Sequence, residues 1–146
     1  MLEYTSSIDI QAPPKVVWNI MADVEHWPNW TPTVTSVTKL VPGPLGLGMA
    51  ARIIQPKLPP AVWRVTEIHD GRDFTWVNRT PGLRVIGSHK IQPTPDGCRV
   101  TVSIRFAGLL APIMGRLFRR LNEDYLATEA RGLKARSESL AAAAAR

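Results

Sequence analysis

Few side chains in this sequence are suited to acid–base chemistry, and they lie far apart in the chain. His89 lies in an apolar stretch beside Gly87 and Ile91, and an imidazole can accept, donate or transfer a proton near neutral pH. Asn78 and Tyr125 are further residues that could orient a polar group of a ligand. For each of them, a core position with the polar atom bonded to a neighbour is at least as reasonable an interpretation.

Metal, nucleotide and nucleophilic-triad sites are not indicated. His26, His69 and His89 fall on separate predicted elements, and the single cysteine, Cys98, belongs to no ligand motif. The glycines of residues 43–48 alternate with prolines and are typical of a turn, not of a phosphate-binding loop. We therefore expect no metal ion and no cofactor, and we assign no catalytic residue.

The composition is that of one globular domain. The 146 residues include 45% hydrophobic and 21% charged residues, enough for a single core. The chain has no apolar run long enough for an integral membrane segment, no signal-peptide pattern and only one cysteine, so we expect a cytoplasmic protein. The net charge is +6, but the arginines form no tract and no recognition motif is present, so we expect no nucleic-acid partner. The oligomeric state stays undetermined.

Helical periodicity is clearest near the C-terminus. The spacing of apolar residues predicts one long helix from Pro112 to Leu140, with the proline in its first turn. Its apolar stripe comprises Ile113, Met114, Leu117, Phe118, Leu121 and Tyr125. The stripe continues with the small residues Thr128, Gly132 and Ala135, which indicate either a close backbone contact or the roof of a cavity. We expect a single domain of residues 1–140 and an Ala-rich frayed tail of residues 141–146.

The preceding chain is organised as a strand, two short helices and six further strands. Alternation and turn residues predict strands over residues 3–10, 34–41, 49–54, 61–69, 73–79, 83–91 and 98–106, and helices over residues 15–21 and 24–27. Consecutive strands joined by tight turns predict an antiparallel sheet of about seven strands. Sheets twist, so a sheet of this size buries one long helix best by curving around it. The predicted fold class is α+β.

Several stretches together carry a resemblance to a known superfamily. They are IQAPPKVVW (10–18), DVEHWPNW (23–30), WRVTE (63–67), SHKI (88–91) and GCRVTV (97–102), with Gly48 and the long helix. In these the chain resembles the START-like (SRPBCC) superfamily with its helix-grip fold, and most closely the branch of polyketide cyclases, dehydrases and lipid transport. The resemblance implies a curved antiparallel sheet around a long C-terminal helix, two short helices after the first strand, and a deep cavity. It implies no particular reaction, because the branch shares a scaffold and not a chemistry.

The resemblance, combined with strand alternation, implies which residues line the cavity. The implied ligand-binding residues are Trp27, Trp30, Ala51, Ile53, Trp63, Val65, Trp76, Asn78, Val85, His89, Leu117, Leu121 and Tyr125. Tryptophan offers a large apolar surface and one N–H, which suits flat or apolar ligands. Trp27 and Trp30 lie beside prolines at the implied entrance and could form a gate. Glu67 is the one strand carboxylate with inward parity, and its place near a strand end predicts exposure.

The expected function is binding or transport of a hydrophobic small molecule, such as a lipid, a polyketide or a flat aromatic compound. One alternative is a polyketide cyclase or dehydratase that positions its substrate in the cavity, with His89 and Tyr125 transferring protons. A second alternative is an interaction module whose basic helix face contacts a protein or, weakly, an anionic membrane surface. A non-catalytic ligand-binding protein is the preferred interpretation.

Overall fold

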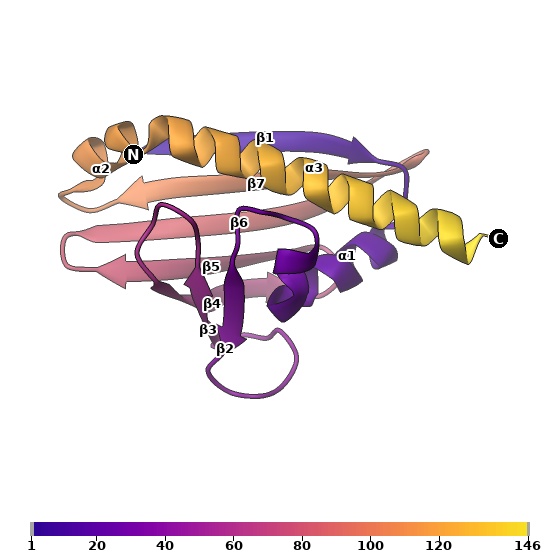
Figure 1. Ribbon diagram of the computed structural model, residues 1–146, viewed down its shortest axis with the longest axis horizontal. Coiled ribbons are helices and arrows are strands. Elements are labelled where there is room, and N and C mark those ends of the chain that lie inside the picture. Colours follow the sequence, from indigo (N-terminus) through magenta and orange to yellow (C-terminus); the bar gives the residue numbers. More distant parts are fainter. Residues whose placement is uncertain (1, 146) are drawn as a thin grey trace.

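The computed structural model describes residues 2–145 and contains one seven-stranded antiparallel sheet (Figure 1). Its strands are β1 (Leu2–Ile10), β2 (Ser36–Lys39), β3 (Ala50–Ile54), β4 (Ala61–His69), β5 (Asp73–Thr80), β6 (Leu83–Thr94) and β7 (Gly97–Ala107). Their order across the sheet is β1-β7-β6-β5-β4-β3-β2, so the first strand pairs with the last and β2 forms the far edge. This confirms the predicted α+β helix-grip architecture.

Two short helices follow the first strand. The first, α1 (Pro14–Ala22), begins with a proline, whose fixed φ and missing N–H are compatible with a helix start. The second is a 3₁₀ helix, η1 (Val24–Asn29), which continues past Pro28, so the prediction that it stops at Trp27 was wrong. The fixed φ of proline fits 3₁₀ geometry. Asp23 occupies the N-cap position without a capping hydrogen bond from its side chain, and its carboxylate instead contacts Nδ1 of His26 at 2.8 Å.

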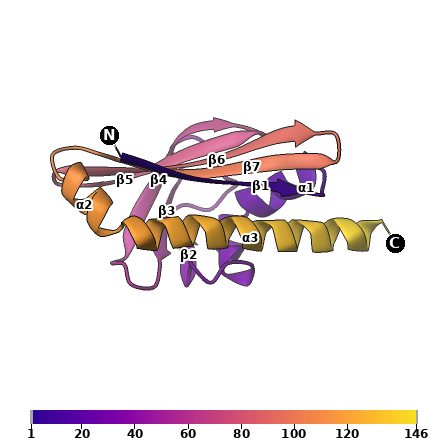
Figure 2. The same ribbon diagram turned by 90° about the horizontal axis from the view of Figure 1, so that it is seen from above.

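The predicted single helix from Pro112 to Leu140 proves to be two helices. The first, α2 (Ala111–Leu117), ends where Phe118 takes φ −99° and ψ 16°, and α3 (Arg119–Ala144) follows. In Figure 2, α2 lies at one end of the molecule, tilted away from the axis of α3. Neither residue at the junction is a proline or a glycine, so no residue there predicted the break.

The buried face of this region is one position away from the predicted stripe. The buried residues of α3 are Asn122, Leu126, Ala130, Leu133 and Ser137. Ile113 and Leu117 of the predicted stripe are 64% and 70% exposed, and Ala135 is also exposed. The hydrophobic pattern misassigned the face because polar Asn122 and Ser137 turn inward while large apolar side chains turn outward.

The surroundings of Gly132 distinguish between the two explanations for the small residues of the helix, which are a close backbone contact and the roof of a cavity. A Cβ added to Gly132 would overlap the carbonyl oxygen of Trp30 and lie 3.3 Å from its ring atom Cε3. The missing side chain therefore lets the backbone of Trp30, which follows η1, approach α3. At Gly132 the small residue makes a close contact and does not form the roof of a cavity.

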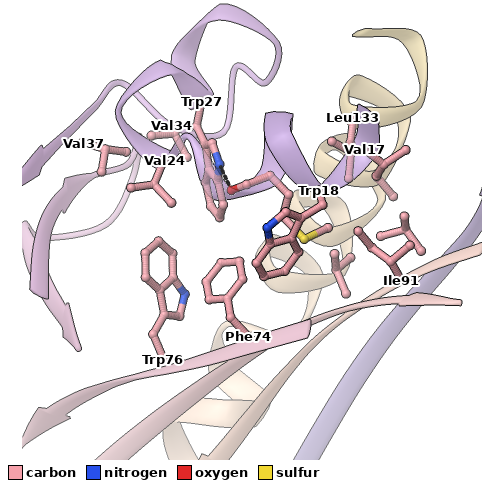
Figure 3. Packing of buried hydrophobic residues seen from close by; sticks show 14 of the residues in the cluster. Val17, Trp18, Val24, Trp27, Val34, Val37, Phe74, Trp76, Ile91 and Leu133 are labelled. Carbon is pink, nitrogen blue, oxygen red and sulfur yellow. Dashed lines mark hydrogen bonds between the residues drawn. The ribbon is translucent and has the colours of Figure 1, made fainter. Parts of the chain in front are cut away.

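The inner face of the sheet packs against α1, η1 and α3 to form the core (Figure 3). Val100 and Val102 of β7 point inward, as the alternation predicts, and Trp18 of α1 packs edge-on against Phe74. In β4 an irregularity between Val65 and Glu67 shifts the register. Such a bulge changes which residues face inward, and Glu67 is exposed, as predicted.

The C-terminal alanines continue α3 to Ala144, and Ala141 packs against the core. Arg146 lies outside the described residues, and the division into residues 1–140 and 141–146 stays a prediction. Within residues 2–145, none of the helices combines the length and the apolar character that crossing a membrane would require.

Candidate functional site

A cavity of about 360 Å³ lies between the inner face of the sheet and the helices α2 and α3. The rest of its wall comes from strands β3 to β7, the loop before β4, Trp27 of η1, and Val34 in the segment between η1 and β2. The volume is near the lower end of the range for small-molecule sites, so the cavity suits a compact ligand.

Three indole rings form a connected aromatic wall, and the fully buried phenyl ring of Phe74 packs against it. The ring centroids of Trp27 and Trp76 are 5.2 Å apart, those of Trp63 and Trp76 are 6.0 Å apart, and Phe74 meets Trp76 edge-on. Figure 3 shows Trp27, Phe74 and Trp76 turned toward one another, with the hydrogen bond that Trp27 Nε1 donates to the Met21 carbonyl. The wall therefore has little rotational freedom.

Gly87 makes room for this wall. It lies opposite Trp76 in the register of β5 and β6. A Cβ added there would be 3.1 Å from both Cδ1 and Nε1 of Trp76 and 3.5 Å from Trp63. The missing side chain lets both indoles lie close beside the strand.

His89 and Glu129 form a polar pair in the wall. His89 Nε2 lies 3.1 Å from Glu129 Oε1, and the two side chains are 7% and 13% exposed. Phe74, the cross-strand neighbour of His89, stacks on the imidazole with centroids 4.4 Å apart and planes 9° apart. The Nδ1 atom of His89 is buried with no hydrogen-bond partner among the described residues. Glu129 lines the cavity, so the histidine holds a carboxylate that faces the ligand space.

Glu129 was missed by the sequence analysis, which searched for an inward carboxylate on the strands. It lies three residues after Leu126 and four before Leu133, which are both buried. That spacing places Glu129 on the buried face of α3. The sequence analysis did not find it because the predicted apolar stripe lay on a different face of the helix. Asn122 was missed for the same reason, and it also lines the cavity.

Two predicted polar residues are engaged with the backbone at the cavity edge. The Tyr125 hydroxyl donates a hydrogen bond to the Pro56 carbonyl, which connects α3 to the loop after β3. Burial raises the pKa of Tyr125, so the phenol keeps its proton and remains a donor at neutral pH. Asn78 Nδ2 donates to the Val62 carbonyl at 2.9 Å. Both side chains shape the wall while donating to backbone carbonyls.

The structure brings together most of the residues predicted to bind ligand, but not all. Those lining the cavity are Trp27, Ile53, Trp63, Trp76, Asn78, Val85, His89 and Tyr125. Ala51 and Val65 are fully buried in the core, and Trp30 packs against Gly132. Leu121 is half-buried outside the cavity wall, and Leu117 faces solvent.

Cys98 lies outside this site and is not disposed to react. It is buried in the sheet near the start of β7, where it pairs with Ile10 of β1. Burial raises the pKa of its thiol, which keeps it protonated and poorly nucleophilic. Within residues 2–145, no three side chains of His, Cys, Asp or Glu come together as a potential metal site.

Comparison with protein families gives one match over nearly the whole chain. The profile of the family described as "Polyketide cyclase / dehydrase and lipid transport" matches residues 1–138. An uncharacterized protein of Mycobacterium tuberculosis (strain H37Rv) is 26% identical over 125 residues, which cover 76% of this chain and 70% of that protein.

Solved structures share the architecture at low sequence identity. A START superfamily protein from Mycobacterium smegmatis has a TM-score of 0.76 at 18% identity, with 94% of this chain and 98% of that chain covered. The di-domain aromatase/cyclase StfQ of the steffimycin biosynthetic pathway has a TM-score of 0.75 at 16% identity, with 96% and 52% covered. A protein from Thermus thermophilus has a TM-score of 0.73 at 21% identity, with 95% and 99% covered. These similarities concern the fold.

Proposed function

Because the chain belongs to the polyketide cyclase/dehydrase and lipid transport family, we propose that it binds a compact hydrophobic molecule non-covalently in the cavity. The observation that carries this proposal is the aromatic wall of Trp27, Trp63 and Trp76 around an internal space of about 360 Å³. Apolar surface removed from water stabilises a complex by about 25 cal/mol per Å². A flat ligand against the indoles would gain most from this burial.

The polar groups of the wall favour a ligand that carries a hydroxyl or N–H group. Glu129 can accept a hydrogen bond from such a donor, and His89 fixes its position. Asn122 also lines the cavity and brings an amide that can donate and accept. The cavity lining formed by the described residues contains no lysine or arginine that could pair with a ligand carboxylate. A hydroxylated aromatic or polyketide-like compound therefore fits better than a free fatty acid.

Filling the cavity should remove binding, and the chain offers a matched control. Val85 lines the cavity, whereas Val62 is 41% exposed and does not line it. We expect Val85→Phe to weaken binding of 2-naphthol, a flat aromatic alcohol, at least about tenfold, because the added ring occupies ligand space. Quenching of tryptophan fluorescence measures the affinity, and Val62→Phe should leave it unchanged.

Native mass spectrometry of the purified protein, with extraction of any bound compound, tests the same proposal without a chosen probe. A discrete added mass in the wild type that is lost in Val85→Phe would support it. Equal behaviour of the Val85→Phe and Val62→Phe variants toward bound compound and 2-naphthol would contradict it.

The His89–Glu129 pair favours a second candidate, proton-transfer catalysis of the cyclase or dehydratase type. A carboxylate held by an imidazole inside an apolar wall can act as a general base toward an acidic C–H of a polyketone. In this assignment Glu129 is the group facing the substrate and His89 is a positioning residue. Tyr125 is less suitable than predicted, because its hydroxyl is engaged by Pro56.

Methylene proton exchange of an aryl 1,3-diketone in deuterated water, followed by NMR, distinguishes catalysis from binding alone. If the second candidate holds, Glu129→Gln should lower the protein-catalysed exchange rate by about 100-fold or more. The affinity for 2-naphthol should fall by much less, because the glutamine side-chain oxygen still accepts a hydrogen bond from the hydroxyl. A wild-type exchange rate equal to that in buffer would exclude this base role and leave the binding proposal intact.

A further inference from the structure

The segment that precedes α3 exposes apolar side chains on a side that no other part of residues 2–145 covers. Leu109 is 91% exposed, Ile113 is 64% exposed and Leu117 is 70% exposed, and Leu110 is also exposed. All four lie within residues 109–117, in α2 and the loop before it. Single exposed leucines are common on protein surfaces, but such a cluster in one short segment marks an interaction site.

The other side of α2 is firmly seated on the sheet. Ala111 and Gly115 are buried, and a Cβ added to Gly115 would lie 2.6 Å from Cδ1 of Leu2. The Tyr4 hydroxyl donates a hydrogen bond to the Gly115 carbonyl at 2.9 Å. The helix is therefore apolar on both sides, and the side pointing outward is presented in a fixed orientation.

The charges around the exposed leucines have one sign. Arg116, Arg119 and Arg120 follow within the same stretch, and residues 108–122 contain no aspartate or glutamate. Arg119 pairs with Glu123 at 2.9 Å, whereas Arg116 and Arg120 have no ion-pair partner among the described residues. An apolar cluster beside unpaired guanidinium groups is complementary to an anionic lipid surface, where headgroup charge and acyl chains are adjacent.

We propose that this face docks on an anionic lipid bilayer. The α2 docking face is defined as Leu109, Leu110, Ile113 and Leu117 with Arg116 and Arg120. In Figures 1 and 2, α2 lies at one end of the molecule, next to the N-terminus and far from the C-terminus, so this end can approach a flat surface.

The docking face is continuous with the ligand cavity. Met114 and Phe118, from the same segment, line the cavity behind the exposed residues. Phe118 lies at the break between α2 and α3, so the docking face and the cavity wall meet at this junction. Resting on the proposed ligand binding, we infer that an apolar ligand enters from the bilayer beside α2.

Vesicle flotation with the full chain tests the docking. We expect the wild type to bind vesicles of phosphatidylcholine and phosphatidylglycerol and to bind phosphatidylcholine vesicles weakly. The pair of substitutions Ile113→Gln and Leu117→Gln should lower the partition coefficient at least about tenfold, because both apolar side chains are lost from the interface. Arg116→Gln with Arg120→Gln should lower it by about tenfold, and added salt should have the same effect.

A matched control substitutes exposed apolar residues elsewhere. Leu47→Gln with Val62→Gln changes two exposed side chains outside the docking face and should leave vesicle binding unchanged. Absence of wild-type binding to anionic vesicles, or equal binding by the Ile113→Gln, Leu117→Gln variant, would overturn the proposal. A dimer in sedimentation that this variant abolishes, without vesicle binding, would assign the face to self-association instead.

The vesicle measurement and the 2-naphthol measurement test the docking proposal and the ligand-binding proposal separately. Vesicle binding is measured on protein freed of ligand, and Val85→Phe should retain it because the cavity is behind the face. Loss of 2-naphthol binding with intact vesicle binding would refute only the proposed ligand. The reverse result would refute only the docking.

Discussion

Replacing His89 with leucine should lower the free energy of unfolding by about 2–3 kcal/mol, the upper part of the range for leaving a buried polar group without its hydrogen-bond partner. His89 Nε2 is 3.1 Å from Glu129 Oε1, with only 7% and 13% of the two side chains exposed. Leucine has a similar volume, so the substitution chiefly leaves the Glu129 carboxylate in an aromatic wall without its partner. Urea unfolding at neutral pH, analysed as a two-state transition, measures the change.

The paired variant His89→Leu, Glu129→Leu provides the decisive control. Replacing both members of a buried polar pair with apolar residues is often nearly neutral, so the double variant should recover most of the lost stability. The resulting coupling free energy is expected to be about 2 kcal/mol. Strictly additive effects of the two single substitutions would show that the pair does not interact in solution.

The strands were predicted well because two independent signals agree on them. Turn residues such as Asp70-Gly71 and Pro81-Gly82 bound the strands, and period-two alternation assigns the faces. Val85 and His89 consequently face the cavity as predicted. The prediction for Glu67 holds even in β4, where the bulge after Val65 shifts the register, because it depended on the place of Glu67 near the strand end.

The helical half of the site was not predictable in the same way. A helix can rotate about its axis, and its apolar stripe is the only signal for the rotation. Here that signal misleads, because Asn122 and Glu129 face the cavity while Leu117 faces solvent. The polar inward residues belong to the candidate ligand site and the outward leucine to the proposed docking face. The missed inward polar residues and the misplaced Leu117 therefore both belong to proposed functional surfaces, where side chains are not chosen for packing alone.

Gly132→Ala should destabilise the protein by about 2–3 kcal/mol, although alanine is the better helix former by about 1 kcal/mol. An added Cβ would overlap the Trp30 carbonyl oxygen and lie 3.2 Å from the carbonyl carbon. Backbone cannot move aside as a flexible side chain can, so α3 must shift away from the end of η1. Trp30 contacts Trp27 with ring centroids 5.6 Å apart, so tryptophan fluorescence should change as well.

Gly46→Ala is the matched control for this substitution. Gly46 lies in an open loop, where an added Cβ meets only the Pro44 carbonyl oxygen at 3.8 Å. The free energy of unfolding of the Gly46→Ala variant should therefore differ from that of the wild type by less than about 0.5 kcal/mol. If Gly132→Ala were as stable as the wild type or more stable, α3 and the end of η1 would have to be farther apart than in the structure. Because Trp27 of η1 lines the cavity, a shift at Gly132 should also weaken 2-naphthol binding. Loss of stability and of binding together would show that this backbone contact holds the aromatic wall in place.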